Sequence, residues 1–280
     1  MNSSSRDAIL SIALLLAVSA PAFCWQDSSQ EQPVLNANRP TGQPNPDQSN
    51  SNFVSRTTQA INYRQGTTND VELRPTALIP DAKGKAKVQT RSGGSDIEAR
   101  VEKLRPANTF GLAYLTYVLW GISPQGQPTN LGELVVDKDG KAMLKTTTPL
   151  QAFAMILTAE PDFAVSIPSE QVVLENYADP KLKGWVRSID VSYHLVPRSQ
   201  YQEQVQPIEK GVYGTTTKDP LILLQARNAV RIAKDAQAAE YAATALQQAQ
   251  QQLDRAEDYN TRKQNKNAIT TVAREAVQSA

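Results

Sequence analysis

The spacing of apolar residues changes from a strand period to a helical period near Gly214, and this change constrains the fold more than any other feature. Between residues 70 and 196, short apolar runs are separated by turn residues, which is typical of strands. After Gly214, apolar residues recur at spacings of three and four, as on one face of a helix. Each pattern must bury its apolar face, so the chain is predicted to hold a β-rich part followed by an α-helical part.

The runs in the first part indicate how individual strands are buried. Ala86 and Val88 alternate with lysines, and the apolar residues of 97–101 alternate with charged ones, as in strands with one wet face. By contrast, residues 114–122 carry apolar side chains on both faces, which predicts a central strand covered on both sides. Roughly eight or nine strands with short turns and no intervening helix predict an antiparallel, immunoglobulin-like β-sandwich.

One polar loop, Asp-Lys-Asp-Gly at residues 137–140, lies between apolar runs at residues 131–136 and 142–146. This spacing predicts a hairpin, with the glycine at a position that needs positive φ. The loop also resembles part of a calcium-binding loop, but Thr146 or Thr148 stands where such a loop needs a bidentate glutamate. The turn is therefore the favoured interpretation.

The helical part contains three Ala-rich apolar stripes, which predict a helical hairpin or bundle with a thin core. Asp219 before Pro220 predicts a helix start, with the Asp side chain capping free amides and the proline in the first turn. The stripes comprise Ile222, Ala226, Ala229, Val230 and Ala233; then Ala242, Leu246, Ala249, Leu253 and Ala256; then Ile269, Val272, Ala273, Ala276, Val277 and Ala280.

The breaks between these stripes are signalled unequally. Residues 262–267 are polar and Asn267 can cap, so a break is predicted between the second and third stripes. No glycine or proline lies between Lys234 and Glu240, so the first two stripes form either one long helix or a hairpin.

Two leucines are predicted to carry a disproportionate share of the helix packing, because alanine methyl groups bury little area. These leucines are Leu246 and Leu253, with Val230, Ile269 and Val272 as their expected neighbours.

Residues 1–24 have the organisation of a signal peptide. A charged start at Arg6 precedes an apolar run at residues 8–18 and then small residues. The run is about half the ~20 residues that a membrane-spanning helix needs, and no later segment approaches that length, so no transmembrane anchor is expected. Cys24, near the cleavage point, invites a lipoprotein interpretation, but the bulky Phe23 before it favours ordinary cleavage.

The rest of the chain divides by composition and pattern. Residues 25–53 are predicted to be a disordered linker, because they are rich in Gln, Asn, Ser, Asp and Pro and carry little apolar surface. A β-sandwich domain at residues 54–200, a linker at 201–217 and an α-helical domain at 218–280 follow. The 29 basic residues nearly cancel the 28 acidic ones, and a net charge of +1 disfavours nucleic-acid binding.

The residue types that carry catalysis are scarce. A Ser-His-Asp site or a zinc site needs histidines or cysteines, and the chain has only His194 and Cys24. His194 lies on the polar face of a predicted strand and is interpreted as a surface residue. No nucleotide-binding glycine motif is present. The prediction is therefore a protein without catalytic, metal-binding or cofactor-binding residues.

Two carboxylates and three aromatic residues leave a carbohydrate function open as the alternative. Glu160 and Glu175, near the ends of apolar strands, are the candidates for acting on a glycosidic bond. Tyr114, Tyr117 and Trp120 could stack on a sugar, but their positions on both faces of one apolar strand favour core packing.

Several sequence runs carry a resemblance to known envelope proteins. The runs are YVLWGISP at 117–124, NLGE at 130–133, FAMILTAEP at 153–161, PS at 168–169 and VVLE at 172–175, followed by AEDY at 256–259 and VAREAV at 272–277. The first part resembles the extracytoplasmic sandwich of anti-sigma-K-type regulators. With the helices, the chain is more similar to the N-terminal region of acidobacterial OmpA-family envelope proteins, over residues 54–280.

The resemblance implies a context rather than a site. In those envelope proteins a similar sandwich precedes Ala-rich helices and then a peptidoglycan-binding domain. No peptidoglycan-binding domain is found up to Ala280, so no wall-binding residue is carried over from the family. The last helical stripe reaches Ala280 without a residue that would stop a helix, which favours a natural protein that continues. The transmembrane helix and sigma-binding segment that anti-sigma proteins need are not found in this sequence.

The sequence thus predicts an exported, non-enzymatic structural or interaction protein of the cell envelope, periplasmic or associated with the outer membrane. Envelope proteins or the peptidoglycan layer are the expected partners. A secreted carbohydrate-binding or carbohydrate-active protein is the alternative.

Overall fold

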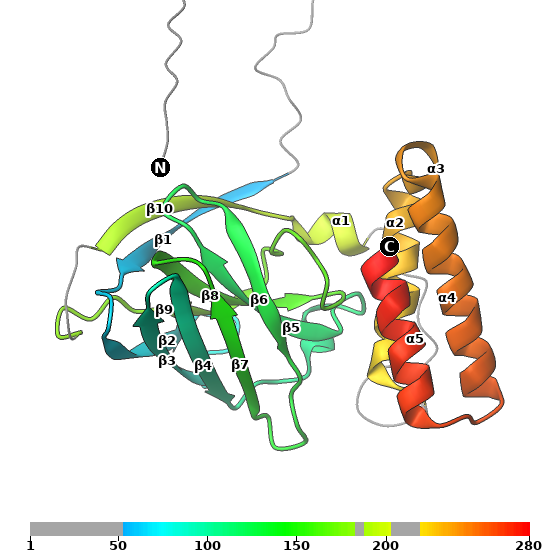
Figure 1. The fold of residues 1–280 in the computed structure, drawn as a ribbon, viewed down its shortest axis with the longest axis horizontal. Helices are drawn as coiled ribbons and strands as arrows, with labels where there is room; N and C mark the ends of the chain where they lie inside the picture. Colours follow the sequence, from blue (N-terminus) through cyan, green and yellow to red (C-terminus); the bar gives the residue numbers. More distant parts are fainter. Residues whose placement is uncertain (1–52, 183–187, 203–218) are drawn as a thin grey trace, which may run out of the picture. The chain divides into compact units, whose positions relative to one another are not determined.

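The computed structural model describes residues 53–182, 188–202 and 219–280 (Figure 1). The predictions on the signal peptide, on Cys24, on the linker before residue 53 and on nearly all of the linker at 201–217 lie outside these residues.

Ten antiparallel strands form one sheet in the described part of the chain (Figure 1). They are β1 (Val54–Asn62), β2 (Thr68–Pro75), β3 (Lys83–Arg91), β4 (Gly94–Glu102), β5 (Thr116–Ile122), β6 (Pro128–Leu134), β7 (Ala142–Thr148), β8 (Ala152–Glu160), β9 (Val172–Asn176) and β10 (Ser188–Leu195). β1 precedes the region in which the apolar pattern predicted strands. It is nevertheless part of the sheet, because it pairs with β10 along nearly its whole length.

The sheet is nearly closed and barrel-like, so the predicted two-sheet sandwich is wrong. Its strands follow the order β10-β1-β8-β9-β2-β3-β4-β7, and β5 pairs with both β8 and β6. β6 and β7 contact each other. The physical reason is β8, whose first residues pair with β1 while the rest pair with β5 and β9, so that no gap divides the strands into two sheets.

The central strands β5 and β8 are buried on both faces. Leu119 and Leu157 belong to the core cluster inside the curved sheet. Val118 and Ile156, on the opposite face, belong to a second cluster that β1 and β10 cover. The prediction of a central strand covered on both sides is therefore confirmed.

The turn at residues 137–140 is confirmed, but the hairpin around it is wrong. Gly140 has φ 74°, and the Asp137 carboxylate accepts the N–H groups of Asp139 (2.9 Å) and Lys141 (2.8 Å). The strands on either side contact each other but form no ladder together: β6 forms its ladder with β5, and β7 forms its ladder with β4. Each strand therefore pairs with another strand of the sheet instead of with the strand across its own turn.

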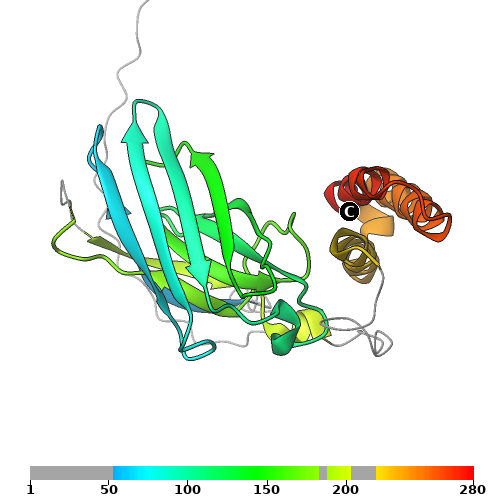
Figure 2. The same ribbon diagram turned by 90° about the horizontal axis from the view of Figure 1, so that it is seen from below.

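The helices follow the predicted stripes, except that Ala242 lies exposed between two helices and Ala280 lies exposed after the last one. They are η1 (Ala107–Phe110), α1 (Arg198–Gln202), α2 (Leu221–Asp235), α3 (Ala238–Tyr241), α4 (Ala243–Thr261) and α5 (Lys266–Ser279). Figure 1 shows α2, α4 and α5 side by side, and Figure 2 shows them nearly end-on. None of the helices in the described ranges combines the length and the hydropathy that crossing a bilayer requires.

The first two stripes form a hairpin rather than one long helix. The chain reverses after α2 at Gln237, which adopts the left-handed conformation with φ 60°. Glycine usually occupies this position at a helix end, and its absence is why the sequence does not signal the break.

Both predicted helix caps are wrong in detail. Pro220 is the N-cap of α2, and the Asp219 carboxylate instead accepts hydrogen bonds from Arg227 and Asn260. α5 is capped by Asn265, which accepts the N–H of Asn267 at 2.9 Å. In both cases the helix begins one or two residues away from the predicted position, within the usual uncertainty of helix boundaries.

The helix core is thin, as the alanine stripes predicted. Leu253, Val230 and Val272 lie in one cluster with closely packed alanines. Ile269 is also buried, whereas Leu246 is only partly buried and packs at the edge of the cluster. Leu253 therefore packs within the helix core, as predicted. Leu246, which was expected to contribute as much to the packing, lies only at its edge.

Candidate functional site

The helices meet the sheet at Glu133 of β6. One oxygen of this carboxylate accepts hydrogen bonds from the Thr116 hydroxyl (2.8 Å) and from the Gln225 amide (2.6 Å). The other oxygen lies 3.7 Å from the Arg274 guanidinium. A single, nearly buried carboxylate therefore joins β5 and β6 to both α2 and α5.

Further contacts surround this carboxylate. Asn228 of α2 donates to the carbonyl oxygen of Ala113 at 2.7 Å. The Phe163 N–H donates to Gln225 at 3.2 Å, and the Arg274 guanidinium lies 4.1 Å from the centroid of the Phe163 ring. We call Glu133, Gln225, Asn228, Arg274 and Phe163 the helix–sheet junction.

The junction was not predicted from the sequence, because the apolar stripe of α2 predicts a helix with one buried face. Leu223 and Leu224 are buried on different sides of α2, the former in the helix core and the latter against Leu115 of the sheet. Gln225 and Asn228 are buried as well. The available signal was the unbroken run Leu-Ile-Leu-Leu at the start of the helix, since a helix that is apolar on more than one side is buried on more than one side.

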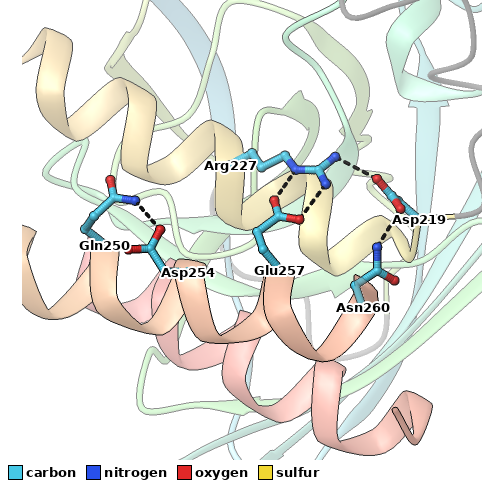
Figure 3. A network of polar contacts seen from close by, with 6 residues as sticks. All are labelled: Asp219, Arg227, Gln250, Asp254, Glu257 and Asn260. Carbon is cyan, nitrogen blue, oxygen red and sulfur yellow. Dashed lines mark hydrogen bonds and ion pairs between the residues drawn. The ribbon is translucent and has the colours of Figure 1, made fainter. Parts of the chain in front are cut away.

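A polar network fixes α2 against α4 (Figure 3). Arg227 binds both oxygens of Glu257, at 2.5 and 2.8 Å, and Asp219 at 2.8 Å. Asn260 donates to the other oxygen of Asp219 at 2.7 Å. Burial raises the pKa of Asp219, but the hydrogen bonds from Asn260 and Arg227 outweigh that effect and leave it lowered.

Glu160, at the end of β8, is fully buried. One oxygen accepts the Ser169 N–H at 2.8 Å and the hydroxyl of Thr158, which in turn accepts the Trp120 indole N–H at 2.8 Å. The other oxygen has no hydrogen-bonding partner among the described residues. Burial raises the pKa of Glu160 to about 8, because the charged form has lost its water. At neutral pH its preferred form is thus the neutral acid.

Asp162 lies two residues beyond Glu160 and is buried as well. Its carboxylate accepts the Ala164 N–H at 2.9 Å, and burial raises its pKa to about 6.

The rings of Tyr114 and Tyr201 pack edge to face with centroids 6.0 Å apart. Burial raises the pKa of both tyrosines, and the neighbouring Glu160 adds to the rise.

Among the described residues, one cavity lies between the sheet side and α2, and another lies at the start of α2. One, of about 320 Å³, is lined by Asp162 and Tyr201 on the sheet side and by Ala233 and Val277 on the helix side. The other, of about 440 Å³, lies where β5 and β6 meet the start of α2, and its walls are mainly apolar. Both volumes fall in the range of small-molecule sites, roughly 300–1,000 Å³.

The structure does not bring the two candidate glycosidic carboxylates together. Glu175 pairs in register with Ile156, which lies four residues from Glu160 along β8. At the rise of a strand, the Cα atoms of Ile156 and Glu160 are about 13 Å apart. Paired catalytic carboxylates stand roughly 5–10 Å apart. Glu175 instead forms an ion pair with Arg56 at 2.5 Å.

The three aromatic residues are core residues, as the favoured interpretation predicted. Tyr114, Tyr117 and Trp120 are almost completely buried, so none presents a ring face to a sugar. A carbohydrate-binding surface would have to lie elsewhere. His194 is exposed on β10, with Nδ1 3.3 Å from the Ser55 hydroxyl.

In the described ranges, no group of three or more His, Cys, Asp or Glu side chains is arranged to hold a metal ion. In the turn that resembles a calcium loop, one oxygen of Asp137 already accepts two backbone N–H groups.

Comparison with models of known protein families and with curated proteins gave no match.

Proposed function

We propose that the chain is an exported, non-enzymatic structural and interaction module of the cell envelope, located in the periplasm or at the outer membrane. The signal-like residues 1–24 and the resemblance to the N-terminal region of OmpA-family envelope proteins support this location. The expected partners are other envelope proteins or the peptidoglycan layer.

The observation that carries the interaction role is the helical surface that the junction leaves open. Glu133, Gln225 and Asn228 hold α2 on the sheet by buried hydrogen bonds. α3 and the first turn of α4 remain exposed, and Tyr241 is 82% exposed. Tyrosine is enriched in protein interfaces because it offers a large, stiff apolar ring with a polar tip. This surface is therefore the preferred contact for a partner.

Cell fractionation tests the location. We expect the protein in the envelope fraction of the native host, with residues before the mature N-terminus removed. N-terminal sequencing of the purified protein identifies the cleavage point. Recovery from the cytosol with Met1 retained would contradict the proposal.

Crosslinking tests the interaction surface. A photo-crosslinking amino acid replaces Tyr241 in one strain and Gln89, exposed on β3, in a matched control strain. We expect irradiation of living cells to join position 241, but not position 89, to an envelope protein or to peptidoglycan fragments. Equal products from both positions, or none from position 241, would remove this surface from the proposal.

A further inference from the structure

The smaller cavity, of about 320 Å³, is lined by the loop after β8, by α1 and by the C-terminal half of α2. Ala229, Ala233 and Ala236 line it at spacings of four and three, which is one face of a helix. Tyr201 of α1 and Val277 of α5 also line it. Because alanine side chains fill little volume, the space between α2 and the loop stays open.

Asp162 carries the only charged side chain among the described residues that line this cavity. It is 5% exposed, and its carboxylate accepts the Ala164 N–H at 2.9 Å. In the described part of the chain, no lysine, arginine or histidine forms an ion pair with it. A buried carboxylate without a cationic partner costs free energy, because the water that it loses is not replaced by an opposite charge. A bound cation would supply that charge.

Asp162 differs in charge from the neighbouring Glu160. Burial raises the pKa of Asp162 to about 6, and the charge of Glu133 adds to the rise. Burial raises the pKa of Glu160 further, to about 8. At neutral pH the preferred form of Asp162 is therefore the anion, whereas that of Glu160 is the neutral acid.

The arginines around the cavity do not cancel this negative charge. Arg231 of α2 forms an ion pair with Asp235 at 2.9 Å, and Arg274 of α5 lies 3.7 Å from Glu133. Arg198, at the start of α1, is exposed, and none of the three arginines is a lining residue. The C-terminal end of α2, which carries a partial negative charge, does line the cavity. The cavity therefore favours a cation.

Hydrogen bonds hold the loop that carries Asp162 in place. The Asn130 amide donates to the carbonyl oxygens of Phe163 at 3.0 Å and Val165 at 2.9 Å. The Phe163 N–H donates to Gln225 of α2 at 3.2 Å. Because the residues beside Asp162 are fixed to both β6 and α2, its carboxylate is positioned before any ligand arrives.

The remaining lining suits an ammonium group on a short alkyl chain. Burial raises the pKa of Tyr201, and the charges of Glu160 and Asp162 add to the rise, so the Tyr201 hydroxyl lies near these carboxyl groups. An ammonium group has three donors for such oxygen atoms. Ile232 and Val277 provide apolar wall for methylene groups. The volume is near the lower end of the roughly 300–1,000 Å³ of small-molecule sites, which favours a short chain.

We infer that this cavity binds a short-chain primary amine, with the ammonium group paired with Asp162 and the alkyl chain against Ile232 and Val277. The inference does not depend on the proposed envelope role, because it rests only on the cavity and its lining.

Calorimetric titration of the full chain with hexylamine at neutral pH tests the inference. We expect saturable binding of hexylamine that is tighter than binding of hexanol, which has the same chain without the charge. Asp162→Asn should weaken hexylamine binding roughly tenfold or more, because the ammonium group loses its charged partner. The asparagine oxygen can still accept the Ala164 N–H, so the variant should melt no lower than the parent chain.

Asp179→Asn is the matched control. Asp179 also accepts the N–H of the residue two positions on, Lys181, at 2.8 Å, but it lies outside the cavity. This variant should bind hexylamine as the parent chain does. No saturable binding of hexylamine, equal affinity for hexylamine and hexanol, or unchanged affinity in Asp162→Asn would overturn the inference.

A second pair of variants tests the place of binding. Ala236→Trp puts a large ring at the cavity and should abolish binding of hexylamine; because Ala236 is exposed, the fold should tolerate the ring. Ala239→Trp, at an exposed position outside the lining, should retain binding. Hexylamine binding that Ala236→Trp retains would exclude this cavity as the site.

A lysine side chain carries the same ammonium group and is distinguished by a further ligand. Nα-acetyllysine methylamide presents that group on a peptide unit, and we expect it to bind more weakly than hexylamine, because a cavity of this size has little room for the peptide unit. Tighter binding of the lysine derivative would replace the free amine by a lysine of another polypeptide.

Discussion

At the scale of single residues, Glu160 is the most unusual group in the described structure. A carboxyl group without contact to water is rare, because the charged form loses its hydration. Glu160 has two hydrogen bonds on one oxygen, from Ser169 and Thr158, and an unpartnered second oxygen. Its environment favours the protonated acid and ties the end of β8 to the segment before β9.

The raised pKa of Glu160 predicts that stability falls as pH rises. In the unfolded chain the carboxyl releases its proton near pH 4.5, and in the folded protein near about pH 8. Between these values the folded state holds more protons, so the free energy of unfolding decreases with pH across this window. Glu160→Gln should flatten that decrease, by an amount on the order of a few kcal/mol, because glutamine stays neutral.

Urea unfolding between about pH 6 and about pH 8 is the measurement, since Asp162, whose pKa is raised to about 6, contributes below that window. Glu72→Gln, on the exposed side of β2, is the matched control and should leave the pH dependence as in the parent. An identical slope in Glu160→Gln and the parent chain would refute the role of Glu160.

Two glycines allow backbone strain and steric contact to be separated. Gly93 and Gly140 both have positive φ, at 88° and 74°, but only at Gly140 does an added Cβ meet another atom, the Leu104 carbonyl oxygen at 2.7 Å. Gly93→Ala should therefore cost about 1 kcal/mol from φ alone, and Gly140→Ala roughly 1–3 kcal/mol more. Thermal melting of the two variants gives the comparison; equal losses would show that the turn shifts freely away from Leu104.

At the scale of elements, the helical hairpin depends on a few large side chains among many alanines. Leu253 lies within the helix core, whereas Leu246 packs at its edge. The network of Arg227, Glu257 and Asp219 adds polar contacts between α2 and α4. The contacts of that network are partly exposed, so we expect packing rather than charge to dominate the stability of the hairpin.

Leu253→Ala should destabilise the full chain by roughly 2–5 kcal/mol, as cavity-forming substitutions in a core do. Leu246→Ala is the control of the same chemistry and should cost clearly less, because its side chain is already partly in water. Circular dichroism at helical wavelengths during urea unfolding measures both. Similar small losses in the two variants would mean that the helices are not packed around Leu253.

At the scale of the whole described structure, the helix–sheet junction decides whether the helices and the sheet behave as one unit. Glu133 is its centre, because α2 and α5 both contact this one carboxylate. The surrounding Asn228 and Phe163 contacts involve the strand ends and the loop after β8. Loss of the carboxylate would leave the Gln225 amide buried without its partner.

Glu133→Ala should therefore loosen the helices without unfolding the sheet. We expect faster amide hydrogen exchange in α2 and α5, with exchange in β2, β3 and β4 unchanged, since the hydrogen-bond and ion-pair partners of Glu133 in the described structure lie on β5, α2 and α5. Glu98→Ala, a partly exposed carboxylate on β4, is the matched control and should leave helix exchange unaltered. Exchange that rises equally in sheet and helices would indicate general destabilisation instead.

The sequence by itself determined the parts of this protein that depend on local pattern. Alternating burial in β3 and β4, double burial of residues 116–122, the left-handed glycine at residue 140 and the three alanine stripes all follow from spacing and backbone chemistry. The core placement of Trp120 also followed, since an apolar strand with aromatic residues on both faces has no wet side.

Only the tertiary structure decided how these elements meet. β8 pairs with three strands, so the expected sandwich is instead a nearly closed sheet. β6 and β7 contact each other but form their ladders with β5 and β4. From their polarity alone, Gln225 and Asn228 would be expected on the surface of a helix. In the structure they are buried, because Gln225 donates to Glu133 and Asn228 donates to the Ala113 carbonyl oxygen. The physical reason is that spacing along a chain specifies which faces are buried, whereas the surface that buries them is chosen by long-range packing among residues distant in sequence.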